Sequence, residues 1–129
     1  MQFHLDQRSG LPMYLQIVRQ VEEALRLGLL DVGDQLPTVR EVVAELAINP
    51  NTVAKAYREL EREGLVDARQ GRGTFVSSTL IASSLEHHES LGRALLAWLA
   101  EAQRAGLDAE SIHALVSRTL REALDRRAA

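Results

Sequence analysis

The sequence predicts a mostly α-helical protein with a small β-hairpin: a winged helix-turn-helix domain over residues 1–78, then a short two-helix C-terminal appendage over residues 79–129. Three observations support this prediction. Two helical segments, each with its own capping residue, are separated by only a tight turn. A hairpin with the glycine turn Gly71-Arg72-Gly73 follows them. After a polar stretch from Ser77 to Ser84, apolar residues return at helical spacing.

The first helix is expected to begin with Pro12 at its first position and to end at Gly28. Before it, the first ten residues are expected to be extended and to end in a turn at Ser9-Gly10. Apolar residues recur in the helix at i, i+3 and i+4, which predicts one buried face. These residues are Tyr14, Ile17, Val18, Val21 and Leu25.

The second helix is expected after a turn at Val32-Gly33-Asp34 and a short strand at Gln35-Leu36. Thr38 is its expected N-cap, and Glu41, three residues further on, completes a capping box. The helix is expected to end near Ala47-Ile48. Its inward-facing residues are Val42, Val43 and Leu46.

The third helix is expected to have Asn49 as its N-cap and Pro50 at its first position, and Gly64 is expected to end it. The strand candidates Leu65 to Arg69 and Thr74 to Ser77 then flank the glycine turn. Together these segments have the order and lengths of a helix-turn-helix with a wing.

The third helix has two distinct faces, because successive residues of a helix are turned by about 100°. The face expected to pack on the first two helices carries Val53, Ala56, Tyr57 and Leu60. The opposite face carries Asn51, Lys55, Arg58 and Arg62. Every member of this outer row donates hydrogen bonds and none is acidic, although the whole chain has a net charge of −3. The row therefore indicates DNA binding.

DNA recognition gives these donors different roles, because residues at the start of such a helix reach base edges and later ones meet phosphates. Arg40, Asn51 and Thr52 suit bases. Lys55, Arg58 and Arg62 suit phosphates, and Arg72 at the wing tip is free to enter a minor groove. The complete set of predicted DNA-binding residues is Thr38, Arg40, Asn51, Thr52, Lys55, Tyr57, Arg58, Arg62, Gly71, Arg72 and Gly73.

Each feature has a plainer interpretation when taken alone. A polar row is usually a solvated face, a glycine-flanked arginine is usually a hairpin turn, and Tyr57 is foremost a core-edge residue. Their coincidence favours the DNA-binding interpretation. The alternative is a winged-helix protein-interaction module without DNA binding, which the acidic net charge favours slightly. An enzyme is a remote third class, because the sequence has no nucleophile elbow or other catalytic constellation.

Four segments carry a family pattern: residues 33–41 (GDQLPTVRE), 51–53 (NTV), 60–65 (LEREGL) and 71–76 (GRGTFV). With the helix that begins near Pro12, they resemble the DNA-binding domain of the GntR family of bacterial transcription regulators. Many members have arginine directly after the valine of NTV, where this chain has Ala54 and then Lys55. The resemblance implies that residues matching Arg40, Asn51 and Thr52 touch bases and that the wing approaches the minor groove.

The variant NTVAKAY, with PMYLQI upstream, is similar to the YtrA subfamily and to the N-terminal domain of MocR regulators. MocR proteins continue into a large aminotransferase-like domain, whereas only residues 79–129 follow here, which favours a YtrA-like protein. Such regulators end in two helices used to dimerise and are often encoded beside ABC-transporter genes. The resemblance thus implies a homodimeric repressor.

The two-helix appendage cannot bury its apolar stripe alone, so the winged domain, a second copy, or both must cover it. A second copy is preferred, because a two-fold symmetric dimer matches a palindromic operator. Gly106 is expected to end the first of these helices and Asp108 to cap the second. The residues expected at the dimer interface are Leu91, Leu95, Trp98, Leu99, Ile112, Leu115, Val116 and Leu120.

The composition excludes several other classes of function. The chain has no cysteine, which rules out disulfides and thiolate chemistry, and no apolar run long enough to span a membrane. His87 and His88 are adjacent and point in different directions on a helix, so no metal site is predicted. No cofactor is expected, and any small-molecule effector would have to bind in a dimer cleft. The protein is expected to be cytoplasmic, with double-stranded operator DNA as its partner.

Overall fold

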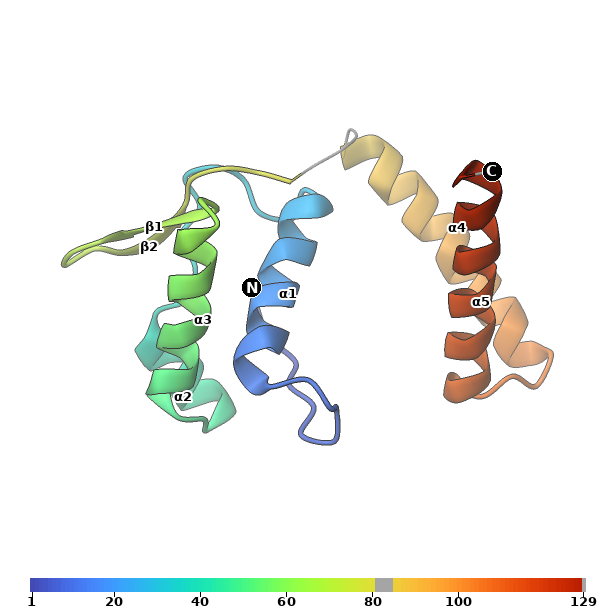
Figure 1. Cartoon of the computed structure of the whole chain (residues 1–129), viewed down its shortest axis with the longest axis horizontal. Coiled ribbons are helices and arrows are strands. Elements are labelled where there is room, and N and C mark those ends of the chain that lie inside the picture. Colours follow the sequence, from blue (N-terminus) through green and yellow to red (C-terminus); the bar gives the residue numbers. More distant parts are fainter. Residues whose placement is uncertain (81–84, 129) are drawn as a thin grey trace. The chain divides into compact units, whose positions relative to one another are not determined.

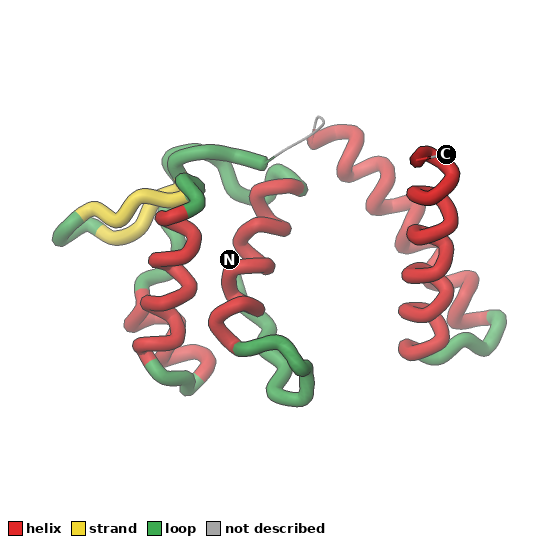
Figure 2. Tube along the Cα trace, viewed as in Figure 1, coloured by secondary structure: helices red, strands yellow, loops and turns green. Residues whose placement is uncertain are grey.

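The computed structural model describes residues 1–80 and 85–128, and divides into two units, Met1–Leu85 and Glu86–Ala129 (Figures 1 and 2). The winged helix-turn-helix region contains α1 (Met13–Arg26), α2 (Val39–Leu46), α3 (Pro50–Arg62), β1 (Val66–Arg69) and β2 (Gly73–Val76). It is followed by two further helices, α4 (Leu85–Arg104) and α5 (Ala109–Ala128). This confirms the predicted fold class. The boundary between residues 78 and 79 stays a prediction, and Ser83 and Ser84 of the predicted polar stretch lie outside the described residues.

α1 begins one residue later than the sequence predicted. Pro12 has φ −53° and ψ 146°, an extended backbone, so it precedes the first helical residue instead of occupying that position. The predicted end at Gly28 is confirmed by its φ of 72°. This left-handed conformation lets the Leu29 N–H donate to the Ala24 carbonyl at 2.8 Å. In a Schellman motif this is the hydrogen bond that spans more residues.

Gln16 is a buried polar residue of α1 that the apolar periodicity did not reveal. Its Nε2 donates to the carbonyls of Asp6 and Leu11, both at 2.9 Å. Its Oε1 accepts from the Asp6 N–H at 2.8 Å. One amide thus satisfies the backbone of the N-terminal segment and holds that segment against α1.

The helix-turn-helix is capped at the predicted residues. Thr38 Oγ1 accepts from the Glu41 N–H at 3.1 Å, and Asn49 Oδ1 accepts from the Asn51 N–H at 2.8 Å. The capping box is half formed, because the Glu41 carboxylate accepts from the Thr38 hydroxyl, at 3.2 Å, and not from its backbone N–H. Ala47, with a left-handed φ of 54°, makes the tight turn between α2 and α3.

The wing is an antiparallel hairpin, with Val66 of β1 opposite Val76 of β2. The predicted short strand at Gln35-Leu36 is present as a single antiparallel bridge between Gln35 and Phe75. Beside it, the Leu36 N–H donates to the Thr74 carbonyl at 2.9 Å. The segment before α2 therefore fastens the base of the wing to the helical part.

The first unit has one apolar core, formed by α1, α2, α3 and the base of the wing. The predicted inward faces of the helices are confirmed, with Val42 fully buried and Val43 and Leu46 partly buried at its edge. The largest fully buried side chains of the described residues are Ile17, Val21, Leu25, Leu36, Val42, Val53, Leu60 and Val66.

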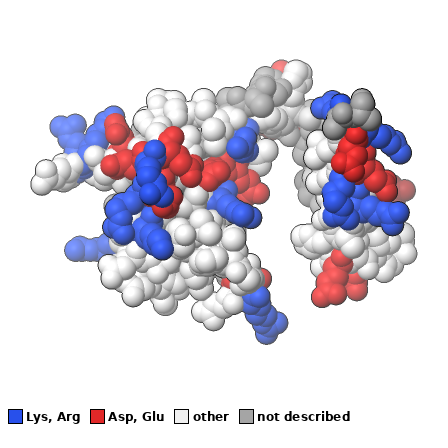
Figure 3. Space-filling model, viewed as in Figure 1, with Lys and Arg blue, Asp and Glu red and all other residues white. Residues whose placement is uncertain are grey.

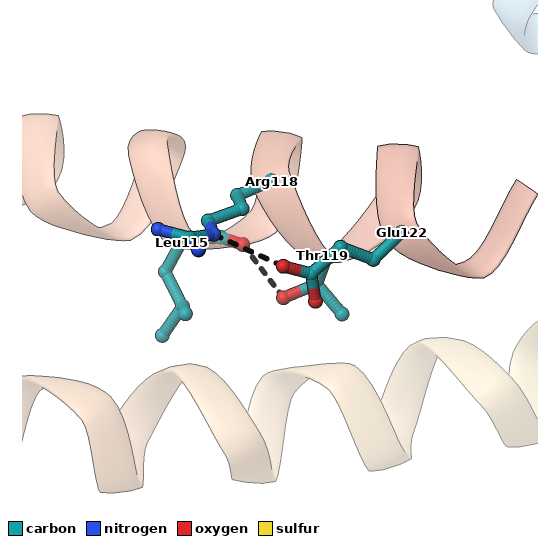
Figure 4. A network of polar contacts seen from close by, with 4 residues as sticks. All are labelled: Leu115, Arg118, Thr119 and Glu122. Carbon is teal, nitrogen blue, oxygen red and sulfur yellow. Dashed lines mark hydrogen bonds and ion pairs between the residues drawn. The ribbon is translucent and has the colours of Figure 1, made fainter. Parts of the chain in front are cut away.

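The second unit has almost no core of its own. Within its described part, Ala102 is the only buried apolar side chain. Its exposed leucines, between 43% and 68% accessible, are Leu91, Leu95, Leu96, Leu115, Leu120 and Leu124. The polar contacts drawn in Figure 4 lie within α5: Thr119 donates to the Leu115 carbonyl at 2.7 Å, and Arg118 pairs with Glu122 at 3.0 Å. They do not join the two helices.

The turn between α4 and α5 follows the prediction. Gly106 has a φ of 95°, and the Leu107 N–H donates to the Ala102 carbonyl at 3.1 Å, which ends α4. Asp108 Oδ1 accepts from the Ser111 N–H at 2.8 Å and so caps α5. Hydrogen bonds from Ser111 hold the pKa of the Asp108 carboxyl below its ordinary value. No helix in residues 1–80 or 85–128 is both long and apolar enough to cross a bilayer.

Candidate nucleic-acid interface

α3 separates its two faces as the periodicity predicted. Val53, Ala56, Tyr57 and Leu60 are buried. On the other side, Asn51, Lys55, Arg58 and Arg62 are exposed, and Thr52 is half-buried at the first turn. The donors therefore form one solvent-facing row on a rigid helix.

A shallow hollow lies at the start of this row, with a volume of about 330 Å³. Its walls come from the start of α1, with Pro12, Met13 and Tyr14, and from α3, with Asn51, Thr52 and Lys55. Lys55 Nζ lies 4.0 Å from the centre of the Tyr14 ring, a cation–π contact. Sequence reasoning placed Tyr14 only in the core, because nothing in a local pattern shows that α1 meets α3 at this point.

Tyr57 connects α3 to the start of α2. Its hydroxyl donates to the Pro37 carbonyl at 2.6 Å. Burial, and secondarily the nearby Glu41 carboxylate, raise the pKa of the Tyr57 hydroxyl, so it keeps its proton for this bond. Since a phenol has one proton, none is left for a phosphate in this arrangement. Contact between Tyr57 and DNA stays a prediction.

Arg40 and Thr38 lie at the N-terminal end of α2. Arg40 is the second residue of the helix and is exposed. The Thr38 hydroxyl is used within the protein, because it accepts from the Glu41 N–H and donates to the Glu41 carboxylate. Thr38 thus fixes the helix end from which Arg40 projects.

Acidic residues accompany the later part of the α3 row. Arg62 forms an ion pair with Glu59 on the same helix, and this hydrogen bond raises the pKa of the Arg62 guanidinium. Partial burial, followed by repulsion from Glu22 and Glu59, raises the pKa of the Glu63 carboxyl. The cationic character of the row is therefore strongest at Lys55 and Arg58 and weaker at Arg62. On the face drawn in Figure 3, basic side chains lie over the wing and α3 with acidic side chains between them.

The wing carries Arg72 at its tip, where the side chain is exposed. Gly71 and Gly73 have φ values of 76° and 122°, in the left-handed region, as their turn requires. The Arg72 N–H donates to the Arg69 carbonyl at 2.9 Å across the turn. Gln35 Nε2 donates to the Arg72 carbonyl at 3.1 Å, a contact that sequence reasoning missed because the two residues are 37 positions apart.

The histidines of α4 lie apart from these residues in the sequence. Within residues 1–80 and 85–128, no three or more histidine, aspartate or glutamate side chains are grouped so that they could hold a metal ion.

The chain is similar to several known proteins. Residues 13–76 match the family described as bacterial regulatory proteins, gntR family. The HTH-type transcriptional repressor YtrA of Bacillus subtilis is 40% identical over 110 residues, covering 84% of this chain and 85% of that protein. The solved structure of YtrA from Sulfolobus acidocaldarius, a GntR-family transcription factor, is similar with a TM-score of 0.54 and 28% identity, over 93% of this chain and 97% of that one. The DNA-binding domain of AraR in complex with operator ORR3 is similar with a TM-score of 0.51 and 28% identity, over 60% of this chain and 93% of that one.

Proposed function

Since the chain belongs to the gntR family of bacterial regulatory proteins, we propose that it represses transcription as a homodimer bound to a two-fold symmetric operator. The chain is a DNA-binding transcription regulator with YtrA-like relatives, and it is not an enzyme. We propose that the protein acts in the cytoplasm, where operator DNA is found.

The observation that supports DNA recognition most directly is the exposed row of donors on α3, beside the exposed Arg40 of α2. In our proposal α3 lies in the major groove, where Asn51, Thr52 and Arg40 read base edges. Lys55, Arg58 and Arg62 hold phosphates, and Arg62 must exchange Glu59 for a phosphate. Arg72 enters the neighbouring minor groove from the wing.

The observation that supports a dimer is the near absence of a core in the second unit. A helical pair that buries only Ala102 among its described apolar residues cannot be stable by itself. A second copy would cover the exposed stripe, and Trp98, Leu99, Ile112 and Val116, which are half-buried, would complete the shared core. Two-fold symmetry then places two copies of α3 in grooves about one helical turn apart, or a multiple of it.

Repression follows from the position of such a dimer on promoter DNA, because a protein that occupies the promoter excludes RNA polymerase. A small-molecule effector, if one acts on this protein, would bind where two copies meet. The controlled genes are expected to include a transporter operon, an inference that comes from the family resemblance alone.

The proposal is tested by fluorescence anisotropy with DNA from the upstream region of the chain's own gene, against a scrambled duplex, over a salt series. Preferential binding by two chains per duplex, weakening steeply as salt rises, is the expected result. In the same assay Arg40→Ala should cost about 1–3 kcal/mol on the preferred duplex and relax discrimination at one base pair. Absence of binding even at low salt would favour a winged-helix module that binds protein instead of DNA.

A further inference from the structure

Gln35 contacts the wing through both its backbone and its side chain. Its backbone forms the bridge to Phe75 of β2. Its side-chain Nε2 reaches past the strand end and donates to the Arg72 carbonyl at 3.1 Å. A single residue, placed just before α2, thus holds both the base and the tip of the hairpin.

Gly73 shows how closely this side chain approaches the wing. A Cβ built on Gly73 would lie 2.5 Å from Gln35 Nε2 and 3.4 Å from its Cδ. Real Cβ atoms do not approach other atoms so closely, so any other residue at position 73 would push the Gln35 amide aside. The absence of a side chain at Gly73 therefore serves the contact with Gln35 as well as the φ of 122°.

The wing tip has few other attachments. β1 and β2 pair over four residues each. The tip beyond them consists of Gln70, Gly71 and Arg72, which are all exposed. A two-stranded hairpin is marginally stable by itself in water. A hydrogen bond to the backbone of Arg72 fixes the peptide from which its side chain projects, and fixes it relative to α2 and Arg40.

We propose that Gln35 is a positioning residue for DNA recognition, which holds the wing tip so that Arg72 is aimed at the groove before DNA binds. This inference rests on the proposed function of the wing. Gln35 itself touches no base. It acts through Arg72, by removing the cost of ordering the tip when the complex forms.

The test compares Gln35→Met, Arg72→Ala and the double variant in the full chain. Methionine has nearly the shape of glutamine but donates no hydrogen bond, so packing over Gly73 is kept while the bond to Arg72 is lost. The probe is the duplex that the wild-type chain enriches from random-sequence DNA. Gln2→Ala serves as the control, because Gln2 is an exposed glutamine of the same unit at the far N-terminal end of the chain.

Gln35→Met should weaken binding about three- to tenfold, the effect of one hydrogen bond, with thermal stability and the Gln2→Ala control unchanged. In the Arg72→Ala background the same change should have an effect of less than about twofold, because the group it positions is gone. Equal losses in both backgrounds would mean that Gln35 only supports the fold, and would overturn the proposal.

Backbone ¹⁵N relaxation of the free protein gives a readout that needs no DNA. The amide of Arg72 should be ordered in the wild type and more mobile in Gln35→Met. An equally ordered tip in both proteins would overturn the proposal even if DNA binding itself is found. A different result would be that the wild type prefers no duplex while the tip is mobile only in the variant. It would count against the proposed function and would still support the positioning of the tip by Gln35.

Discussion

At the scale of single residues, the candidate nucleic-acid interface is held in shape by side chains whose hydrogen bonds are made within the protein. The Tyr57 hydroxyl donates to the Pro37 carbonyl, and the Thr38 hydroxyl accepts from the Glu41 N–H. These side chains fix the helix ends from which freely exposed residues such as Arg40 and Asn51 project. Side chains that are hydrogen-bonded inside the fold thus position the exposed donors that we propose for DNA contact.

Replacing Tyr57 with phenylalanine removes the bond to the Pro37 carbonyl while keeping the buried ring. We expect the free energy of unfolding to fall by about 1–2 kcal/mol, because a partly buried carbonyl loses its donor. Urea unfolding measures the change. Tyr14→Phe is the matched control: within the described residues the Tyr14 hydroxyl makes no hydrogen bond, so stability should change by less than about 0.5 kcal/mol. Equal losses in the two variants would contradict the role given to the Tyr57 hydroxyl.

Replacing Gly73 with alanine adds a Cβ at a left-handed φ and against the Gln35 amide. We expect a loss of about 1–2 kcal/mol from backbone strain, together with a mobile wing tip. Gly92→Ala provides the comparison, since nothing lies within 4 Å of a Cβ at Gly92 and its backbone is helical. That substitution should be neutral or stabilising. A Gly73→Ala protein as stable as wild type by urea unfolding would show that Gln35 moves aside at no cost.

At the scale of elements, each helix is delimited by signals within a few residues of its ends. Thr38 and Asn49 as caps, and Gly28, Gly64 and Gly106 as terminators, could all be predicted, because capping depends on local backbone groups. The single-residue error at Pro12 has the same local origin, since proline fits both the N-cap and the first helical position.

Contacts between elements could not be predicted from the sequence. Tyr57 meets Pro37 over 20 positions, and Gln35 meets Arg72 over 37. The Lys55–Tyr14 contact likewise joins α3 to α1. Such pairs depend on how helices and strands pack, and periodicity reports only which face of an element is buried. The sequence therefore predicted the exposed donors of α3 but neither Tyr14 in the hollow nor Gln35 behind the wing.

Asp108 makes the start of α5 sensitive to acid. Its pKa lies below the ordinary aspartate value, because the folded helix donates hydrogen bonds from Ser111 to the carboxylate. The carboxylate therefore stabilises the folded state above the unfolded pKa, and this stabilisation is lost as pH falls through the lower folded pKa. Carboxyl ¹³C NMR should find Asp108 titrating below an aspartate in an unstructured peptide. In Asp108→Asn the cap should persist without this titration; an ordinary pKa in the wild type would contradict the capping role.

At the scale of the whole molecule, the two units differ in how they are stabilised. The first has an apolar core of its own, whereas the second exposes its leucines and buries Ala102. An exposed apolar stripe of this kind is typical of an interface. In our proposal the winged unit contacts DNA, and α4 and α5 supply the surface on which the dimer depends.

Replacing both Leu95 and Leu120 with glutamate should convert the proposed dimer to monomers, because each leucine is more than half exposed in the single chain and would be buried between copies. Sedimentation measures the mass, and circular dichroism the helix content. Leu29→Glu is the control: Leu29 is 69% exposed but belongs to the winged unit, so this variant should stay dimeric. Dimers that survive the double replacement would place the interface elsewhere.

The sparse core of α4 and α5 also bears on how long a copy of the protein lasts in the cell. A chain without its partner would present loosely held leucines and helices that open readily, and proteases cleave segments that open locally. Pairing would close that route, so unpaired copies would be removed faster than assembled ones. In the proposed dimer the same exposed stripe would thus act as a degradation signal, and the lifetime of each chain would depend on whether it is paired with a second copy.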